Sequence, residues 1–322
     1  IGSDTKIGRV VSLGNQIPGL AQVFNRIDPD LVLIAGDREE ALSVTLTAAY
    51  MDIPVAHFFG GDVAKDGNID NSVRYAASKL AHLHLPTLEQ HRETLLKLGE
   101  DDWRIHVVGN PAIDRIISVP KLNREDIFLK FGLTDNSNNY FVLIQHSIIT
   151  EVEQQSFQIR QTLDAILESD TFCFINYPNS DAGNQAIIDA YNEYASKFPD
   201  NFVLFKNLDR LHYVNLLRNA SCLLGNSSSG LLEAPSLGLP AINIGNRLRG
   251  RIHGENVIFV DNNKGDILKA IDVVLNDNKF RALVNKRINP YGDGKSAERI
   301  YQVIKRLEFS SELIHKNITY YE

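Results

Sequence analysis

A turn made of small residues, GNSSSG at positions 225–230, leads from an apolar run into a helical pattern. The exposed N–H groups and hydroxyls of such a turn can bind a diphosphate, and the start of a helix adds partial positive charge. Glu233 would then reach the hydroxyls of a ribose, and the guanidinium of Arg247 would grip a phosphate. An ordinary capped helix and a solvated basic loop are the alternative interpretations of these segments.

Carboxylates gather in a second region of the sequence. Asp37 and Arg38 stand between a predicted strand and a predicted helix, where an Asp often serves only as a helix N-cap. The loop HFFGGD at 57–62 ends at Asp62, its glycines permit close approach of a ligand, and Asp70 follows. Carboxylates in such a setting can transfer protons. Their spacing matches neither an EF-hand nor a His-rich zinc site, so the sequence predicts no metal.

Two further polar segments follow predicted strands. His146 comes directly after an apolar run, although a lone histidine is often only a hydrogen-bonded structural residue. The segment YPNSDAG at 177–183 supplies Asn179 and Asp181, an amide and a carboxylate that can bind a nucleotide or a sugar. A plain turn would use the same residue types.

Short β-rich runs alternate with helical stretches, the pattern of βα units that build a parallel sheet. The first series predicts strands at 31–35, 53–57 and 105–108, with helices at 39–51 and 71–82. The second series predicts strands at 140–144, 171–175, 202–205, 222–224 and 240–244. Ligands bind beyond the carboxyl ends of such strands, and the polar segments all lie there.

The polar stretch at 133–140 indicates a join between two domains, and we place the boundary near residues 120–138. The fold class is therefore α/β, with two doubly wound Rossmann-like domains that face a central cleft. We expect an N-terminal domain at 1–125, a nucleotide-binding C-terminal domain at 126–305, and a last segment at 306–322 that packs back on the N-terminal domain.

The composition narrows the classes of function. With 33 Lys and Arg against 40 Asp and Glu, the net charge of −7 disfavours electrostatic binding to nucleic acid or to an anionic membrane. Cys173 and Cys222 lie in apolar runs and are interpreted as small buried hydrophobes. The sequence shows neither a secretory signal nor an apolar run long enough to span a bilayer, so we expect a cytoplasmic protein. No metal or redox cofactor is implied.

Taken in order, several segments resemble the hydrolysing UDP-N-acetylglucosamine 2-epimerase family, particularly its sialic-acid and nonulosonate branch. The segments that carry this resemblance are PDLVLIAGDREE, IPVAHFFGGD, IDNSVRYAASKLAHLH, VVGNPAID, YPNSDAG, GNSSSGLLEAPSLGLPAINIG and NPYGDGKSA. The resemblance implies the GT-B architecture, a UDP-sugar substrate, UDP as product, and assembly as a homodimer or homotetramer.

The resemblance also implies roles for individual residues. Asp37 and Asp70 would be catalytic acids, with Asp62 as a further candidate. His146 would contact the diphosphate and take part in catalysis. The residues implied to hold the UDP-sugar are Arg38, His57, His146, Asn179, Asp181, Ser227, Ser228, Glu233 and Arg247.

The sequence departs from the family pattern at two places. The strand and loop with which family members begin are not found, so we expect this chain to lack them. Several relatives also carry Glu where this chain has Phe59, and Asp62 or Asp66 would substitute for it. Three alternatives follow: a 2,4-diacetamido-6-deoxy sugar nucleotide as substrate, a glycosyltransferase of the same architecture, and a nucleotide-sugar sensor without catalysis.

Overall fold

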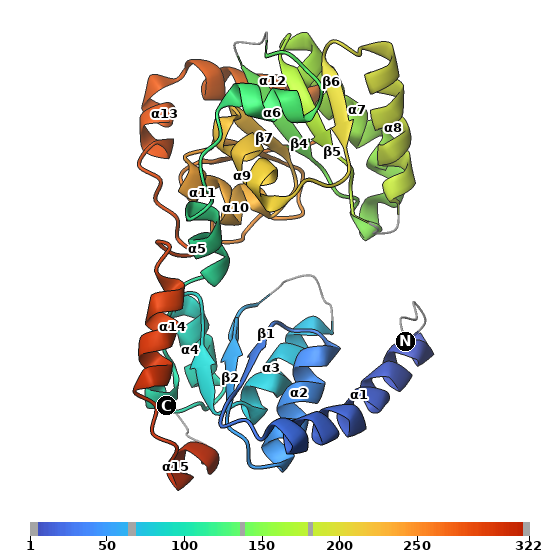
Figure 1. The fold of residues 1–322 in the computed structure, drawn as a ribbon. Helices are drawn as coiled ribbons and strands as arrows, with labels where there is room; N and C mark the ends of the chain where they lie inside the picture. The colour runs from blue at the N-terminus through green and yellow to red at the C-terminus, as the bar shows by residue number, and fades with distance from the viewer. Residues whose placement is uncertain (1–5, 64–68, 136–138, 180–182, 318–322) are drawn as a thin grey trace. The chain divides into compact units, whose positions relative to one another are not determined.

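The computed structural model describes residues 6–63, 69–135, 139–179 and 183–317 (Figure 1). The chain divides into two compact units: a first unit of 1–111 with 294–322, and a second unit of 112–293. The division lies earlier than the predicted boundary near 120–138, because Ile116, Ile127 and Phe128 are buried in the core of the second unit.

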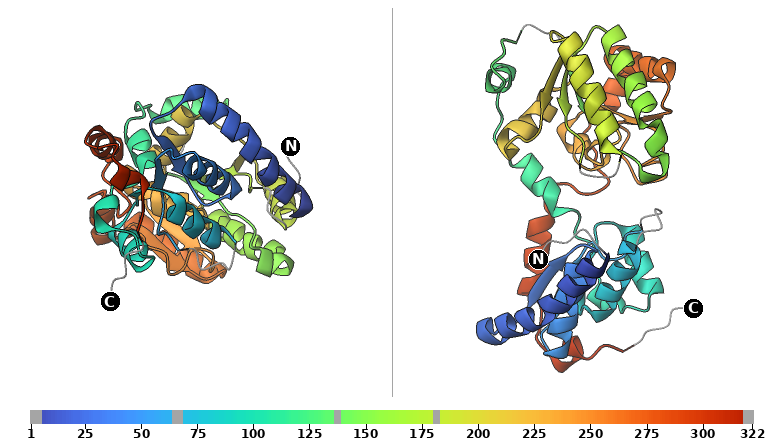
Figure 2. Two further views of the ribbon diagram at one scale, coloured as in Figure 1. Left: turned by 90° about the horizontal axis from the view of Figure 1, so that it is seen from below. Right: turned by 90° about the vertical axis from the view of Figure 1, so that its right-hand side faces the viewer.

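The first unit contains a parallel sheet of order β1-β2-β3, formed by Val32–Ala35, Val55–Phe58 and Leu83–Leu85. Its helices are α1 (Lys6–Ile27), α2 (Glu39–Tyr50), α3 (Asp70–Leu80), α4 (Glu89–Lys97), α14 (Ser296–Lys305) and α15 (Ser311–Ile314). Neighbouring residues of β2 face opposite sides, as strand geometry requires. Val55 packs with Phe24 of α1 and Ala48 of α2, whereas Ala56 belongs to the cluster that packs against α14. The helices α1 and α2 thus cover one side of the sheet and α14 the other (Figures 1 and 2).

The second unit contains a six-stranded parallel sheet of order β6-β5-β4-β7-β8-β9. Its strands are β4 (Tyr140–Ile144), β5 (Phe172–Asn176), β6 (Phe202–Phe205), β7 (Cys222–Gly225), β8 (Ala241–Ile244) and β9 (Val257–Val260). Its helices are α5 (Pro111–Ile117), α6 (Arg124–Lys130), α7 (Gln155–Glu168), α8 (Asn184–Lys197), α9 (Arg210–Asn219), α10 (Ser229–Leu232), α11 (Ala234–Leu237), α12 (Lys264–Asn276) and α13 (Asn278–Val284). This is the Rossmann strand order, in which the direction of winding reverses between β4 and β7.

The central strand β4 explains why the second sheet is buried on both faces. Phe141 and Leu143 belong to the cluster under α7, α8 and α12, and Tyr140 and Val142 belong to the opposite cluster. A strand buried on both sides is apolar at every position, as expected for a parallel sheet covered by helices. Cys173 and Cys222 lie in the first of these clusters as free buried thiols, as predicted.

The other differences between the predicted and the observed helices and strands lie mainly in the first unit. The strand predicted at 105–108 is reduced to an isolated bridge between Ile105 and His84. The third strand is instead β3, which begins after the end of α3. The strand β9 and the helix α1 were not predicted. Within the described residues, no helix is both long and apolar enough to cross a membrane.

The end of the described chain contacts the first unit, the place predicted for 306–322. Arg104, whose side chain is 1% exposed, donates to the carbonyl oxygens of Leu313 and Glu312 at 2.8 and 2.6 Å and to that of His82 at 3.0 Å. Lys316 donates to the carbonyls at the end of α3, including that of Ser78. These contacts fix the segment after α14 and supply partners to the last turn of α3.

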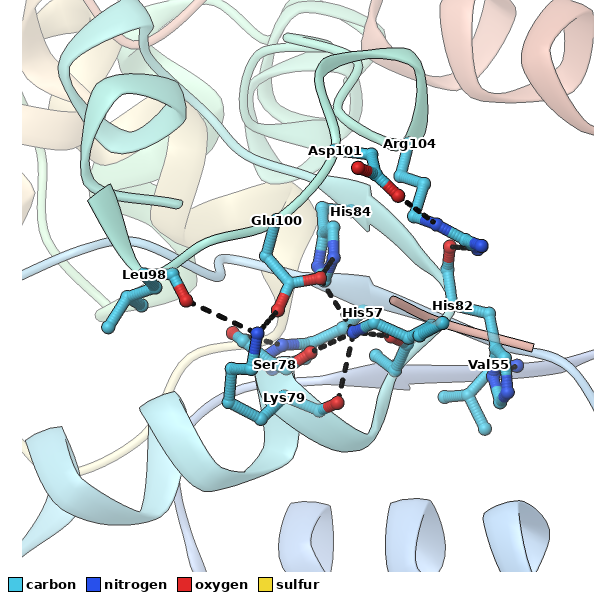
Figure 3. Close-up of polar contacts among 12 residues, drawn as sticks. Val55, His57, Ser78, Lys79, His82, His84, Leu98, Glu100, Asp101 and Arg104 are labelled. Atoms are coloured by element: carbon cyan, nitrogen blue, oxygen red, sulfur yellow. Dashed lines mark hydrogen bonds and ion pairs between the residues drawn. The ribbon is translucent and has the colours of Figure 1, made fainter. Parts of the chain in front are cut away.

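A buried charge cluster holds this arrangement together (Figure 3). The Glu100 carboxylate is fully buried, with the amines of Lys79 and Lys316 each at 2.6 Å and Nε2 of His84 at 2.8 Å. Burial alone would raise the pKa of Glu100, but the hydrogen bond from His84 and the charge of Lys316 lower it to about 2. Burial lowers the pKa of His84, and that of the neighbouring His82, to about 4.

The free energy of unfolding should therefore fall as the pH drops from about 6.5 to about 4. Below the ordinary histidine pKa of 6.5, His82 and His84 take up protons when unfolded but not when folded, so acid favours the unfolded chain. The lowered pKa of Glu100 adds a further loss below 4.5. Melting temperatures of the whole chain between pH 4 and 7 measure this slope.

The variant His82→Asn tests how much His82 contributes to this pH dependence. Nδ1 of His82 accepts from the Val55 N–H at 3.1 Å, and the amide oxygen of Asn can accept the same bond without titrating. The slope of melting temperature against pH should be shallower in this variant. Equal slopes in the two proteins would show that His82 does not contribute.

Candidate functional site

The first candidate site lies at the reversal point of the second sheet, where β4 and β7 end side by side. Asn226 joins the two strand ends: its Oδ1 accepts from the His146 N–H at 2.7 Å, and its Nδ2 donates to the His146 carbonyl at 2.9 Å. Gly225, with φ of 115°, brings this turn against the carbonyl of Ile144. The crevice at such a reversal point is the general ligand position in doubly wound sheets.

The turn after β7 presents donors for an anion. Among the hydrogen bonds of the described residues, the backbone N–H groups of Ser227 and Ser228 have no protein acceptor, whereas that of Ser229 donates to Ser227 Oγ at 3.3 Å. Backbone donors at such a turn suit phosphate oxygens. The helix that follows is shorter than expected, because α10 and α11 are separate four-residue helices, so the N–H groups themselves are the main donors.

Two charged or titratable side chains reach the same strand ends. Arg247 follows β8, is exposed, and donates to the Asn226 carbonyl at 2.9 Å. Nδ1 of His146 accepts from the Asn179 N–H at 3.1 Å. A neutral ring that accepts at Nδ1 carries its proton on Nε2, where it can donate to a phosphate oxygen. The structure thus brings His146, Asn179 and Arg247 into one group around Asn226.

Glu233 lies between α10 and α11. Burial raises its pKa, while a hydrogen bond with Ser229 and the charge of Arg210 act in the opposite direction. Ser229 Oγ is also 3.3 Å from the hydroxyl of Tyr213. Glu233 is therefore anchored beside the turn of Ser227. Its carboxylate can accept a hydrogen bond from a hydroxyl group, such as those of a ribose.

The second candidate site lies in the first unit and is organised by Arg74 of α3, which is 4% exposed. Its guanidinium pairs with the Asp37 carboxylate and donates to the Asp62 carbonyl at 2.7 Å and to Asn71 Oδ1 at 3.0 Å. One buried cation thus joins the end of β1, the loop after β2 and the start of α3. The first residue of that helix is Asp70.

Asp37 and Asp62, which both contact Arg74, have different surroundings. Asp37 is not an N-cap, because the N-cap of α2 is Arg38, which makes no side-chain capping bond and is exposed. Oδ1 of Asp62 accepts from the Val63 N–H at 2.8 Å and lies 3.4 Å from Nε2 of His91. Side chains held at strand ends in this way can address a ligand in fixed orientations.

His57 differs from the role that the resemblance implies. It is fully buried, its Nε2 is 2.8 Å from the Gly36 carbonyl, and its Nδ1 is 3.1 Å from Ser78 Oγ. Both ring nitrogens therefore have protein partners. This geometry favours a supporting role for His57 over contact with a substrate.

Asp66 and Asp181 lie outside the described residues.

Sequence reasoning missed Arg74 and Asn226. Arg74 lies in the predicted helix, four residues after Asp70, and residues at this spacing share one helix face, so the spacing was an available signal. Asn226 lies inside the GNSSSG motif, but its bonds to another strand have no sequence signal. Within the described residues no group of three or more His, Cys, Asp or Glu could hold a metal ion.

Comparisons with known proteins agree with this architecture. The family model described as UDP-N-acetylglucosamine 2-epimerase matches residues 2–305. The chain is 34% identical over 305 residues to the UDP-N,N'-diacetylbacillosamine 2-epimerase (hydrolyzing) of Legionella pneumophila, which covers 95% of this chain and 78% of that protein. It is 32% identical over 296 residues to the UDP-N-acetylglucosamine 2-epimerase of Neisseria meningitidis, covering 92% and 76%.

The fold comparison gives the same class. The crystal structure of UDP-GlcNAc 2-epimerase from Neisseria meningitidis bound to UDP-GlcNAc is similar with a TM-score of 0.77 at 20% identity, covering 95% of this chain and 84% of that one. This similarity confirms the predicted α/β fold of the GT-B class. Because the family model spans nearly the whole chain, the protein belongs to the UDP-N-acetylglucosamine 2-epimerase family.

Proposed function

We propose that this protein is a hydrolysing 2-epimerase that converts UDP-N-acetylglucosamine to N-acetylmannosamine and UDP. The observation that carries the proposal is the set of contacts of Arg74, which pairs with the Asp37 carboxylate, donates to the backbone carbonyl of Asp62 and lies on the helix that begins with Asp70. Carboxylates near a bound sugar can transfer protons as general acid and base. We assign the carboxylates to proton transfer and the turn at Ser227 to the diphosphate.

The first step of the proposed reaction is elimination. No carbonyl next to C2 of the sugar acidifies its hydrogen, so removal of the C2 proton requires simultaneous departure of UDP. The C1–O bond breaks and its electron pair leaves with UDP. A carboxylate accepts the C2 proton as general base, and the C–H electron pair forms the C1–C2 double bond of 2-acetamidoglucal.

The second step is the addition of water. The oxygen of water bonds to C1 and keeps one proton as the hydroxyl, while its other proton goes to a carboxylate. The electron pair of the double bond takes a proton from a protonated carboxyl and forms the new C2–H bond, on the face opposite the one that lost the first proton. The configuration at C2 is thereby inverted and the free sugar results. We assign these transfers to Asp37, Asp62 and Asp70 as a group.

Stabilisation of the leaving group is assigned to the second unit. Negative charge grows on the diphosphate as the C1–O bond breaks, so donors that bind this charge lower the barrier. The free N–H groups of Ser227 and Ser228, Nε2 of His146 and the guanidinium of Arg247 are the donors that we propose for it. Glu233 is proposed to accept the ribose hydroxyls, and Asn179, which contacts His146, to support the same nucleotide.

A second candidate substrate is UDP-N,N'-diacetylbacillosamine, which carries a second acetamido group and no hydroxyl at C6. The observation that favours it is the 34% identity to the enzyme of Legionella pneumophila named for that substrate, slightly above the 32% to the enzyme of Neisseria meningitidis named for UDP-N-acetylglucosamine. The chemistry at C1 and C2 is the same for both substrates. A parallel assay of the two UDP-sugars distinguishes them.

Incubation in heavy water tests the reaction. Phosphorus NMR should show free UDP, and proton NMR should show a free mannose-type sugar with deuterium at C2. A product still bound to UDP would make the enzyme a non-hydrolysing epimerase, and an unlabelled C2 would exclude elimination and addition. Release of UDP only with an added acceptor would indicate a glycosyltransferase, and binding without turnover would indicate a sensor.

A further inference from the structure

The protonation pattern of His57 follows from its two partners, Gly36 and Ser78. Nε2 lies 2.8 Å from the carbonyl oxygen of Gly36, which can only accept a hydrogen bond. Nε2 therefore carries the proton and donates it. Nδ1 then has a lone pair and accepts from the hydroxyl of Ser78 at 3.1 Å. The three groups form a chain of hydrogen bonds in which the Ser78 hydroxyl donates to the His57 ring and the ring donates to the Gly36 carbonyl.

The surroundings keep this ring neutral. His57 and Ser78 are both fully buried, and burial lowers the pKa of His57, as does the positive charge of Arg74. The hydrogen bond to Gly36 raises the pKa by less than burial lowers it but by more than Arg74 lowers it, and the charge of Asp37 raises it least. A neutral ring with both nitrogens satisfied is stable inside a protein, whereas a charged one would lose the bond from the Ser78 hydroxyl.

The acceptor of this chain lies next to a candidate catalytic residue. Gly36 directly follows β1 with φ of 100°, a conformation that favours glycine, and the next residue is Asp37. The N–H of Gly36 is bonded to the carbonyl of Phe58 at 3.4 Å, and its carbonyl to His57. The ring thus fixes the orientation of the peptide unit that leads into Asp37.

Two side chains of α3 act on the same turn. Arg74 and Ser78 are four residues apart and therefore lie on one face of the helix. Arg74 holds the carboxylate of Asp37, and Ser78 holds the preceding peptide through His57. The turn at 36–37 is thereby attached to α3 at two points, one on the side chain and one on the backbone.

We infer that His57 is a positioning residue for Asp37: the hydrogen-bond chain from Ser78 through His57 to the Gly36 carbonyl holds the Asp37 carboxylate in its orientation for proton transfer. The inference rests on the proposed function, since it assigns proton transfer to Asp37. His57 itself touches no substrate. This role differs from the UDP-sugar contact that the family resemblance implies.

Substitutions at His57 and Ser78 test the inference. His57→Leu removes both bonds, and kcat should fall on the order of a hundredfold while KM and the affinity for UDP stay within about twofold. In His57→Gln the amide Nε2 can still donate to the Gly36 carbonyl, and most of kcat should return. Ser78→Ala should lower kcat by about tenfold, because Nδ1 loses its donor. His106→Gln changes a partly buried histidine that takes no part in these hydrogen bonds, and it should leave kcat unchanged.

The outcomes separate the two proposals. A wild-type protein that turns over no UDP-sugar contradicts the proposed function, whereas full kcat in His57→Leu with an active wild type overturns the positioning role. A rise in KM at unchanged kcat would instead assign the ring to substrate binding. Nitrogen-15 NMR of the wild type should show the His57 proton on Nε2 from about pH 6 to 8. A proton on Nδ1 would refute the hydrogen-bond chain from Ser78 to Gly36, even if His57→Leu fails to fold.

Discussion

Asp37→Asn is expected to lower kcat by about a thousandfold. The amide keeps the size of the carboxyl group and can still accept from Arg74, so the fold around the buried guanidinium should survive. An amide cannot take up the C2 proton, however, and general acid–base catalysis is worth about 10² to 10⁴ in rate. UDP release measured by a coupled assay gives kcat, and calorimetry with UDP gives the affinity, which should be unchanged.

The control for this substitution is Asp28→Asn. Asp28 is exposed after the end of α1 in the same unit and has φ of 51°, a conformation in which Asn is also well tolerated. It should leave kcat and the melting temperature unchanged. An Asp37→Asn enzyme with wild-type kcat would remove Asp37 from the reaction and leave Asp62 and Asp70 as the remaining candidates.

The second unit was largely predictable from sequence because of how its sheet is buried. The strands at 140–144 and 202–205 were predicted with the bounds that the structure has, since both are short apolar runs between polar turns. The predicted strand at 240–244 begins one residue later, after Pro240. The order of the strands, by contrast, depends on pairing between distant segments and was not predicted beyond the doubly wound class.

The first unit was harder to predict because its signals are weaker. The strand β3 has only three residues and follows α3 almost directly, so its apolar pattern merges with that of the helix. The helix α1 contains Pro18, which usually counts against a helix interior, and its sequence gave no element in our interpretation. The strand at 105–108 was predicted from its β-branched residues, but after Ile105 the chain leaves the sheet.

The candidate sites show the same difference between features set by nearby residues, which could be predicted, and features set by residues distant in sequence, which could not. The rule that ligands bind at carboxyl ends of strands selected Asp37, His146 and Ser227 correctly as strand-end residues. Whether such a side chain faces a ligand or the protein depends on partners far away in sequence. His57 illustrates this limit, since its bonds to Gly36 and Ser78 span 21 residues in each direction.

The parallel strands β4 and β7 approach so closely at their ends that they leave no space for a side chain at position 225. A Cβ atom built on Gly225 would lie 2.1 Å from the carbonyl oxygen of Ile144 and 2.6 Å from its carbon, distances that real contacts do not show. The φ of 115° is also a conformation that residues with a Cβ rarely adopt. The backbone itself would have to move, and with it the Asn226 bonds to His146.

Gly225→Ala should therefore destabilise the second unit by about 3 kcal/mol and lower its melting temperature by roughly 10 °C. The affinity for UDP should fall as well, because the Asn226 side chain can no longer join both strand ends. Gly250→Ala separates the steric clash from the backbone strain. At Gly250 φ is 80°, but among the described residues other than its two chain neighbours no atom lies within 4 Å of the added Cβ, so only backbone strain of about 1 kcal/mol is expected. Thermal unfolding and UDP calorimetry of both variants measure the difference, and equal melting temperatures would show that β4 and β7 can separate at this point without cost.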